Sequence, residues 1–385
     1  MHLLKTIVLA GFFIITGFTV FAQYYSDLDR ALKEPEKVDT LNLGNTNLTD
    51  IPPEIEAFVN LRYLDISYND IRSLPPELCR LTNLEVLIAE ENRIRELPEE
   101  FGSLKQLSRL NFKNNRISEL PKSFAELENL ESADFSSNML AEVQKELYQL
   151  PNLKRLVLRD NRIEEVSKMR KAEILEYLDL YGNRLQDFPK NLYKIESLKY
   201  LELGNNRLSE LEEGSSDLIH LKYLGLENNR LRSLDDDFTK DFNADELNLG
   251  FNRLKTVPGA LFKKKNLKYI DLRGNQIPGE IIKDLRDSLH ATEVNMRLNT
   301  YELNEVEEFL SLEEALKNPS EVYILKLINT PVIPNEIFKL SNLQSLTLES
   351  NNLDFLPERM GELVNLEILK LANNNKIPYT FRFAR

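Results

Sequence analysis

One pattern of apolar and polar positions, L-x-x-L-x-L-x-x-N-x-L, recurs along most of the chain, and Leu198 to Leu208 is a clear copy. Neighbouring copies mostly lie 23 residues apart. The central leucine and the residue two positions later point to the same side of an extended chain, so each copy predicts a short strand with one buried side. Stacked copies therefore predict a row of parallel strands with a continuous core between them.

The central apolar position recurs fifteen times, in a long series and a short one. It is occupied by Leu41, Leu64, Leu87, Leu110, Ala133, Leu156, Leu178, Leu201, Leu224, Leu247, Ile270, Val294, Leu325, Leu346 and Leu369. After many copies comes a Leu-Pro pair, such as Leu74-Pro75, and then a variable segment. Because proline interrupts regular hydrogen bonding, we expect turns or brief helices on this outer, convex side. Cys79 lies there, and we expect a small buried hydrophobe rather than a nucleophile.

An asparagine follows the strand in thirteen copies, and Thr46 and Thr330 replace it in the other two. The chain must turn there inside the stack, where backbone groups lie away from water. An amide side chain donates and accepts at once, so we expect each asparagine to bind backbone groups of its own loop and of the next repeat. Ligand binding by this row is the less favoured interpretation. The asparagines are Asn69, Asn92, Asn115, Asn138, Asn161, Asn183, Asn206, Asn229, Asn252, Asn275, Asn299, Asn351 and Asn374.

Residues 1–22 predict a secretory signal peptide. His2 and Lys5 give a weakly positive start, Thr6 to Phe21 is apolar, and Ala22 is a small residue suited to cleavage before Gln23. A retained anchor is the alternative, although the apolar run is shorter than the about 20 residues of a membrane span. No later stretch could span a membrane, so we expect a secreted or periplasmic protein without an integral membrane segment after signal removal.

Residues 23–40 predict an N-terminal cap that covers the apolar edge of the first repeat. Ser26 and Asp29 form a candidate capping box, and Leu28 and Ala31 lie on one helical face. Pro35 then ends the helix.

The spacing of the pattern changes between Val294 and Leu325, which lie 31 residues apart. Residues 301–322 contain a near copy of the cap, because Ala315 to Val322 resembles Ala31 to Val38. Either the sheet runs on past this insertion or the chain hinges into two lobes; the absence of a Gly- or Ser-rich linker favours continuity. We divide the chain into repeats 1–12 (41–300), a cap-like helical insertion (301–322), repeats 13–15 (323–378) and a tail (379–385).

The fifteen copies resemble the leucine-rich repeat family, in its 23-residue form with Leu-Pro after the consensus, and the chain looks like a secreted, bacterial-like member. The resemblance implies an α/β solenoid: a right-handed curved horseshoe with a concave parallel β-sheet and an irregular or short-helical convex side. Members are mostly protein-binding scaffolds. Some bacterial members carry a ligase domain with a catalytic cysteine after the repeats, but no cysteine follows Cys79 here.

Candidate catalytic chemistry is weak. The chain contains no phosphate-binding loop, no nucleophile elbow and no H-E-x-x-H zinc motif. Ser215 to Asp217 with His220 suggest a catalytic triad, but this run occupies the outer return segment that every repeat has. Asp235 to Asp237 suggest a calcium site, but they lack the spacing of a calcium-binding loop. We therefore predict no enzymatic activity and no cofactor. The net charge of -13 also argues against nucleic acid as a partner.

The concave face is the surface that can carry specificity, because the strand residues that flank the buried positions point outward. Tyrosine recurs before the central leucine, and acidic residues recur after it, so we expect Tyr177, Tyr200 and Tyr223 to form a contiguous ladder on strands about 4.8 Å apart. Tyrosine suits both a binding site and cross-strand packing, and binding is the favoured interpretation. The candidate partner-binding residues are Tyr63, Asp65, Tyr177, Asp179, Tyr181, Tyr200, Glu202, Tyr223, Phe251, Tyr269 and Asp271.

Basic residues form a second group. Arg109, Lys113, Arg155 and Arg159 predict a patch of opposite sign on the concave face. Arginine also recurs directly after the asparagine, where we expect a solvated rim that pairs with nearby glutamates. This row consists of Arg93, Arg116, Arg162, Arg184, Arg207, Arg230 and Arg253.

The sequence therefore predicts a non-enzymatic scaffold that binds a protein or peptide ligand on its concave face, with Asp179, Glu202 and Asp271 selecting basic groups. A glycan-binding or cell-surface adhesion protein is the alternative, because aromatic faces stack on sugars; the absence of tryptophan counts against it.

Overall fold

In the computed structural model of the chain, the described residues are 24–166, 172–189, 192, 195–211, 220–234, 242–264, 266–278, 281, 284–285, 288–289, 293–295, 307–319, 322–340, 342–353, 356–363, 366, 368–374 and 380–381. The predicted signal peptide, Ser215 to Asp217 and Asp235 to Asp237 lie outside them. Among the described residues, no helix has the length and apolar character needed to cross a membrane.

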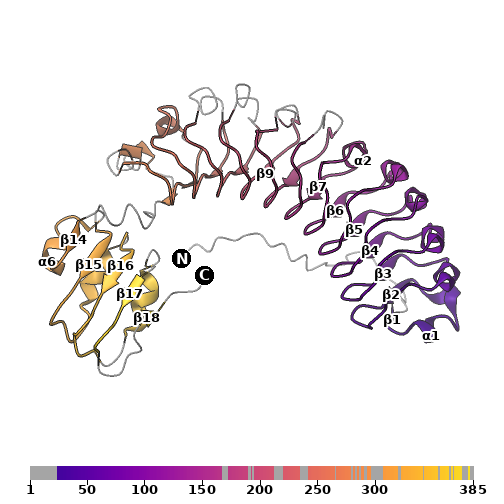
Figure 1. Cartoon of the computed structure of the whole chain (residues 1–385), viewed down its shortest axis with the longest axis horizontal. Coiled ribbons are helices and arrows are strands. Elements are labelled where there is room, and N and C mark those ends of the chain that lie inside the picture. Colours follow the sequence, from indigo (N-terminus) through magenta and orange to yellow (C-terminus); the bar gives the residue numbers. More distant parts are fainter. Residues whose placement is uncertain are drawn as a thin grey trace. The chain divides into compact units, whose positions relative to one another are not determined.

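Short parallel strands, one per repeat, form a sheet of thirteen described strands in sequence order along the inner side of an arc (Figure 1). The central leucines align from strand to strand, as Leu201 does with Leu178 and Leu224, so the predicted strands are confirmed. The strands are β1 (Tyr24–Tyr25), β2 (Thr40–Asn42), β3 (Tyr63–Asp65), β4 (Val86–Ile88), β5 (Arg109–Asn111), β6 (Ser132–Asp134), β7 (Arg155–Val157), β8 (Tyr177–Asp179), β9 (Tyr200–Glu202), β10 (Tyr223–Gly225), β11 (Glu246–Asn248), β12 (Tyr269–Asp271) and β13 (Glu293–Asn295).

The outer side of each repeat returns through short helical turns, as the proline spacing predicts. Proline stands at the start of several, where its missing N–H costs no hydrogen bond. Cys79 is buried as predicted, and burial raises the pKa of its thiol to about 12. These elements are α1 (Leu28–Ala31), α2 (Lys145–Tyr148) and the 3-10 helices Pro35–Lys37, Pro53–Ala57, Pro76–Arg80, Phe101–Ser103, Lys122–Glu126 and Leu261–Lys263.

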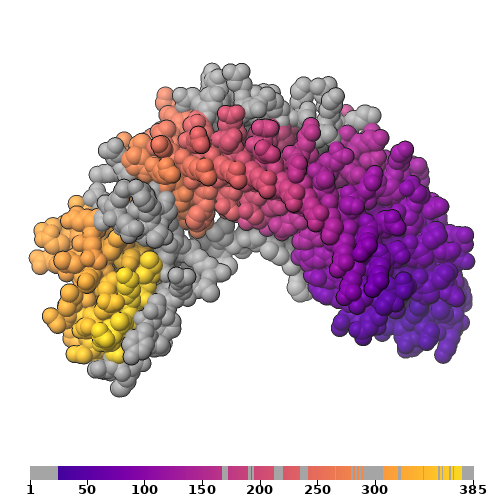
Figure 2. Space-filling view, in the orientation of Figure 1, coloured from indigo at the N-terminus to yellow at the C-terminus, as the bar shows by residue number. Residues whose placement is uncertain are grey.

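The core between the two sides consists of repeated leucines and a cluster of phenylalanines. Phe101, Phe112, Phe124 and Phe135 are fully buried, with neighbouring ring centroids 5.8–6.1 Å apart. Such aromatic contacts add to the free energy of burial. The repeats of the larger unit pack closely enough that their side chains close into one continuous surface from the indigo to the magenta part of the chain (Figure 2).

The buried asparagines link the repeats. The Asn206 amide donates to the carbonyls of Leu180 and Leu203, both at 3.0 Å, and its oxygen accepts from the Leu185 N–H at 3.0 Å. The predicted role is confirmed, but the amide nitrogens of asparagines such as Asn69, Asn206 and Asn374 reach back to the preceding repeat rather than forward to the next. The Thr46 hydroxyl donates to the Leu43 carbonyl at 2.6 Å and to the Asn69 Oδ1 at 3.5 Å, in both cases as a donor, so threonine does only part of this work.

The N-terminal cap differs from its predicted form. Tyr24–Tyr25 form β1, which pairs with β2, and the helix is capped by Asp27, whose carboxylate accepts from the Arg30 N–H at 2.7 Å. The predicted capping box at Ser26 is therefore wrong by one residue. Ala31 is buried as the helical pattern predicts.

The last repeats form a second sheet of five described strands, and the chain divides into two compact units near residue 295. The single continuous sheet that the sequence favoured is therefore wrong for the described strands. Strand, helix and strand follow one another at its start, as they do at the N-terminus, and the predicted tail contributes an antiparallel strand. The elements are β14 (Glu308–Phe309), α6 (Leu312–Ala315), β15 (Ile324–Lys326), β16 (Ser345–Thr347), β17 (Ile368–Lys370), β18 (Thr380–Phe381) and the 3-10 helices Asn335–Lys339 and Glu358–Glu362.

Candidate functional site

Three tyrosines of the larger unit stack on neighbouring strands of the inner face. Tyr177, Tyr200 and Tyr223 align in register on β8, β9 and β10. Their ring centroids lie 4.2 Å and 4.3 Å apart, with planes inclined by only 7°. The predicted ladder is confirmed, and we call these residues the tyrosine stack. Parallel strands hold equivalent side chains at about 4.8 Å, which places the rings face to face.

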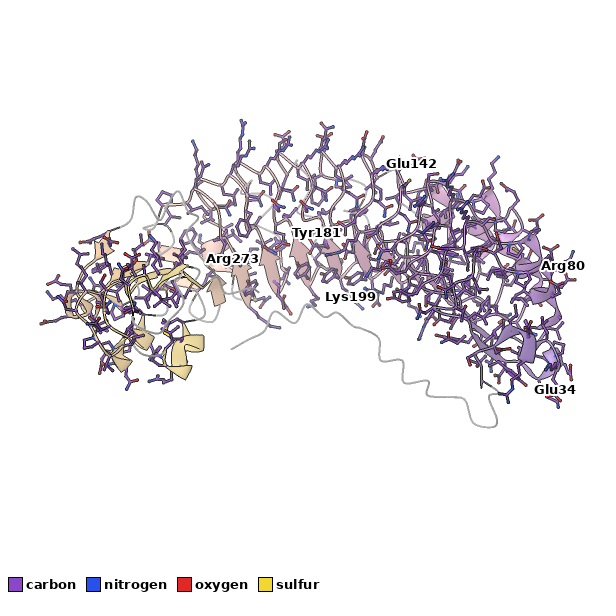
Figure 3. All side chains as sticks on the ribbon, turned by 60° about the horizontal axis from the view of Figure 1, so that its bottom comes forward. Glu34, Arg80, Glu142, Tyr181, Lys199 and Arg273 are labelled. Atoms are coloured by element: carbon purple, nitrogen blue, oxygen red, sulfur yellow. The ribbon has the colours of Figure 1, made fainter. Side chains whose placement is uncertain are left out.

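Arg155 extends the tyrosine stack, and Arg159 covers the neighbouring Tyr181 ring. Arg155 on β7 lies over the Tyr177 ring, with its Cζ 3.6 Å from the ring centroid, and Arg159 lies over Tyr181 at 4.2 Å. Figure 3 labels Tyr181, which directly follows Leu180, the buried leucine just after β8. Guanidinium groups bind aromatic faces through cation–π attraction. These two arginines of the predicted basic patch therefore lie against the aromatic surface around the tyrosine stack.

The two carboxylates beneath the tyrosine stack are buried, although strand alternation places them on the inner face. Asp179 and Glu202 are each only 4% exposed. Asp179 accepts from the Tyr181 N–H at 3.0 Å and from the Arg159 Nε at 3.3 Å. Glu202 accepts from the Gly204 N–H and the Tyr223 hydroxyl, both at 2.7 Å. Both oxygens of each carboxylate thus have a donor within the chain.

The recurring Asp or Asn between the two buried strand positions has a structural role that sequence analysis missed. Its side-chain oxygen accepts from the N–H two residues later, which closes a local turn at the end of the strand. The acidic pattern is therefore explained without a ligand. The pairs are Asn42 with Gly44, Asp65 with Ser67, Asn111 with Lys113, Asp134 with Ser136 and Asn248 with Gly250.

Two glycines create the space that Glu202 occupies. A Cβ at Gly225 would lie 2.2 Å from the Glu202 Oε1, and a Cβ at Gly204 would lie 2.9 Å from the same atom. Gly225 stands at the strand position where neighbouring repeats carry Glu202 and Asn248. A glycine at a strand position signals close approach by another group, and Gly225, the last residue of β10, could have been noticed in the sequence for this reason.

Burial controls the titration of these groups. It raises the pKa of Glu202 to about 7, although hydrogen bonds from Tyr223 and Gly204 act in the opposite direction. Burial also raises the pKa of Asp179, despite the nearby Arg159 guanidinium. The pKa of Tyr223 rises as well, first through burial and then through the Glu202 charge. The tyrosine hydroxyl therefore stays protonated and remains a donor to Glu202.

The remaining predicted residues lie away from the tyrosine stack. Tyr269 and Asp271 are on β12, separated from Tyr223 by Glu246 on β11. Asp271 is only 1% exposed, and the Tyr269 hydroxyl lies 3.4 Å from its Oδ2. Tyr63 and Asp65 are on β3, where the neighbours of Tyr63 are Thr40 and Val86 rather than aromatic residues. The strand residues that the sequence predicts as one site therefore lie at three separate locations on one sheet.

Phe251 lies outside the strands, just before a buried asparagine. Its backbone has a positive φ of 53°, and its side chain is 53% exposed. Tyr68 holds the same repeat position with a φ of 55° and 56% exposure, and sequence analysis missed it. Left-handed backbone is unfavourable for bulky residues. Since Asn or Asp would fit these positions with less strain, the exposed aromatic rings are candidates for contact with a partner.

Metal chemistry finds no support in the part of the chain that the structure describes. No group of three or more His, Cys, Asp or Glu residues there has the proximity needed to hold an ion. The inner face instead offers stacked rings, guanidinium groups and satisfied carboxylates. This arrangement can bind a partner but presents no activated nucleophile.

Comparison with known proteins agrees with this fold. A family model described as leucine-rich repeat region matches residues 38–172, and one described as leucine rich repeat matches 151–208, 173–231 and 219–277. Together the matches span residues 38–277, and the chain belongs to the leucine-rich repeat family. A leucine-rich repeat protein of Leptospira interrogans is similar, with 26% identity and a TM-score of 0.61, over 93% of this chain and 96% of that one.

Two other solved structures share the fold. An internalin from Listeria monocytogenes has 18% identity and a TM-score of 0.60, over 90% of this chain and 89% of that one. The ectodomain of a plant membrane receptor kinase from Arabidopsis thaliana, solved with CASPARIAN STRIP INTEGRITY FACTOR 2, has 22% identity and a TM-score of 0.55. The match covers 88% of this chain and 53% of that one.

Proposed function

We propose that this chain is a non-enzymatic scaffold that binds a protein or peptide on the inner face of its larger unit. The observation that carries this proposal is the tyrosine stack with Arg155 and Arg159, set on consecutive strands of one sheet. Tyrosine and arginine dominate the energetics of protein interfaces because they combine large contact area with polar tips. A surface that is already ordered also loses little conformational entropy on binding.

The geometry of the tyrosine stack suggests where a basic ligand group would bind. Arg155 covers the outer face of Tyr177 at one end. At the other end, Tyr223 neighbours the exposed Glu246 on β11. A ligand Arg or Lys over Tyr223 would repeat the contact that Arg155 makes and would gain the Glu246 carboxylate as a partner. Selection of basic groups therefore falls to Tyr223 and Glu246 rather than to the satisfied Asp179 and Glu202.

The test is a comparison of two alanine variants at the same repeat position. The mature chain would first be used to isolate its partner from the native source, and affinity would then be measured with the purified partner. Tyr200→Ala should weaken binding at least tenfold, a typical loss at an interface hot spot, whereas Tyr63→Ala should leave the affinity within about twofold. Equal affinities for the two variants would reject the tyrosine stack as the binding site.

Glycan binding remains the second candidate and is disfavoured by one observation. Tyr200 is covered on both ring faces by Tyr177 and Tyr223, at centroid distances of 4.2 Å and 4.3 Å. A sugar ring therefore cannot lie flat on the middle of the tyrosine stack. Binding of the mature chain on a glycan array, lost in Tyr200→Ala, would favour the adhesion hypothesis instead.

We further propose that the protein is secreted or periplasmic and looks like a bacterial member of its family. The apolar segment before Gln23 and the internalin and receptor-ectodomain similarities support this location. N-terminal sequencing of the exported protein should begin at Gln23. A chain that retains Met1 would contradict cleavage and favour a retained anchor.

A further inference from the structure

Four arginines line a pocket of about 170 Å³ on the flank of the second, third and fourth repeats. We call it the arginine pocket, and its residues are Arg72, Arg93, Arg95 and Arg116. All four side chains are exposed. The pocket lies just past the buried asparagines, outside the strands that carry the tyrosine stack, so it is a second and independent feature of the surface.

The backbone holds these arginines close together. The N–H of Arg93 donates to the Ile71 carbonyl at 2.9 Å, and the N–H of Arg116 donates to the Ile94 carbonyl at 2.8 Å. Arg95 and Arg72 lie on adjacent turns in the same way, because the Arg95 N–H donates to the Arg72 carbonyl at 3.3 Å. Ile71, which precedes Arg72, and Ile94, which lies between Arg93 and Arg95, are fully buried, so the neighbouring arginines point outward.

The charge in the pocket is poorly balanced. Within residues 24–166, all of which the structure describes, one ion pair involves these four arginines, between Arg93 and Asp70 at 2.8 Å. Of the four guanidinium groups, only that of Arg93 is therefore in an ion pair within these residues, in a chain whose net charge is -13. Neighbouring like charges destabilise a folded protein, and the chain holds ample carboxylates to pair with them.

Elsewhere on the same flank some arginines are paired or stand beside uncharged and acidic positions, but Arg230, Arg232, Arg253 and Lys255 repeat the same arrangement on the ninth and tenth repeats. Arg184 stands at the position equivalent to Arg93 and pairs with Glu164 at 3.5 Å. Arg162 is also equivalent, and its N–H donates to the Leu140 carbonyl at 2.9 Å, but the adjacent positions on its flank carry Met139, Ala141 and Glu164. Clustered cations therefore recur along this flank, and on repeats two to four the four guanidinium groups line a common pocket.

From this geometry we infer that the arginine pocket binds a tetrahedral oxyanion, a phosphate or sulfate group carried by a ligand. Guanidinium groups present paired N–H donors that match the oxygens of such anions, and several of them together offset a double negative charge. A bound anion would also remove the repulsion among the four arginines. A lysine in place of one of these arginines would keep the positive charge but lose the paired N–H donors. Such a variant therefore tests whether the geometry of the donors matters in addition to the charge.

The probes are inorganic pyrophosphate, inorganic sulfate and a sulfated heparin tetrasaccharide, titrated calorimetrically into the mature chain at low chloride concentration. At least one should bind with a Kd below about 1 mM. Arg95→Ser should weaken that binding at least tenfold, and Arg95→Lys should fall between the two. Tighter binding of pyrophosphate would identify a phosphate source, and tighter binding of the tetrasaccharide would identify a sulfated glycan.

Two further variants separate a built site from diffuse charge. Asp70→Asn should tighten binding about threefold, because it releases the Arg93 guanidinium from its ion pair. Arg162→Ser removes one positive charge outside the pocket, from the position equivalent to Arg93 and Arg116, and should change affinity less than about twofold. Absence of binding by all three probes, or equal weakening by Arg95→Ser and Arg162→Ser, would overturn the inference.

Discussion

The tyrosine stack and the arginine pocket lie on the same sheet-and-turn framework but treat charge in opposite ways. Around the tyrosine stack, Glu202 and Asp179 are buried, and each carboxylate oxygen accepts a hydrogen bond from within the chain. In the arginine pocket, four exposed guanidinium groups share a single ion pair with Asp70 among the described residues. The carboxylates near the tyrosine stack thus have hydrogen-bond donors within the chain, whereas only one of the four guanidinium groups has an ion-pair partner among the described residues.

This difference separates groups that stabilise the fold from groups that are available to a partner. A buried carboxylate with all its donors in place is costly to disturb, so mutation there should change stability first. An exposed, unbalanced cluster contributes little to stability and gains most from a ligand. Mutations can therefore test whether each charged group belongs to structure or to binding.

The largest effect is expected from Gly225→Ala. The added Cβ would lie 2.2 Å from the Glu202 Oε1 and would displace the carboxylate from its two donors. The free energy of unfolding should fall by about 3–4 kcal/mol, as overpacking and lost hydrogen bonds combine. Gly259→Ala is the matched control, because its Cβ meets no atom within 4 Å. Similar urea unfolding curves for the two variants would mean that Glu202 has room to move.

A pH-dependent stability should follow from Glu202. Its pKa is about 7 in the folded chain and 4.5 in its ordinary state. Between those values the folded chain holds more protons than the unfolded chain, so the free energy of unfolding falls as pH rises through this window. Glu202→Gln should reduce the difference in stability between pH 4.5 and pH 8 by roughly 2–3 kcal/mol. An unchanged pH profile in this variant would assign the titration to another group.

Tyr223→Phe should have a smaller effect. It removes the hydroxyl that donates to Glu202 at 2.7 Å and leaves a buried carboxylate with one donor fewer. We expect a loss of about 2 kcal/mol at pH 8 and a smaller loss at pH 5, where Glu202 is protonated. Tyr269→Phe is the control, because the Tyr269 hydroxyl makes a longer and therefore weaker hydrogen bond of 3.4 Å to the Asp271 Oδ2. Thermal unfolding of both variants at the two pH values would show whether the loss depends on a charged Glu202.

The smallest effect is expected from removing an arginine of the pocket. Arg95→Ser should change the free energy of unfolding by no more than about 0.5 kcal/mol, since its side chain is exposed and forms no ion pair with a described carboxylate. Arg159→Ser should cost about 1 kcal/mol, because it removes a donor from the buried Asp179. A larger loss for Arg95→Ser than for Arg159→Ser would reverse the comparison between the two regions.

Much of the fold was predictable because the repeat period identifies equivalent positions. The strands, the buried asparagines and the alignment of Tyr177, Tyr200 and Tyr223 all follow from counting 23 residues along the chain. The division into two sheets was not predictable in the same way, although the sequence contained the second cap. A near copy of Ala31 to Val38 signals a new start, but only strand pairing shows that a new sheet begins there.

The sequence by itself determined which residues stand next to one another along the stack, because one repeat follows another at a fixed rise. Only the tertiary structure decided what their charged groups do. Glu202 lies in the space above Gly225, and Arg159 turns towards Asp179 and Tyr181. Such choices depend on side-chain conformation and burial between repeats, which no periodicity encodes. The same reason explains why the acidic strand residues suggested a binding site and instead close turns. It also explains why Arg93 and Arg116, predicted as part of a solvated rim, line a pocket with Arg72 and Arg95.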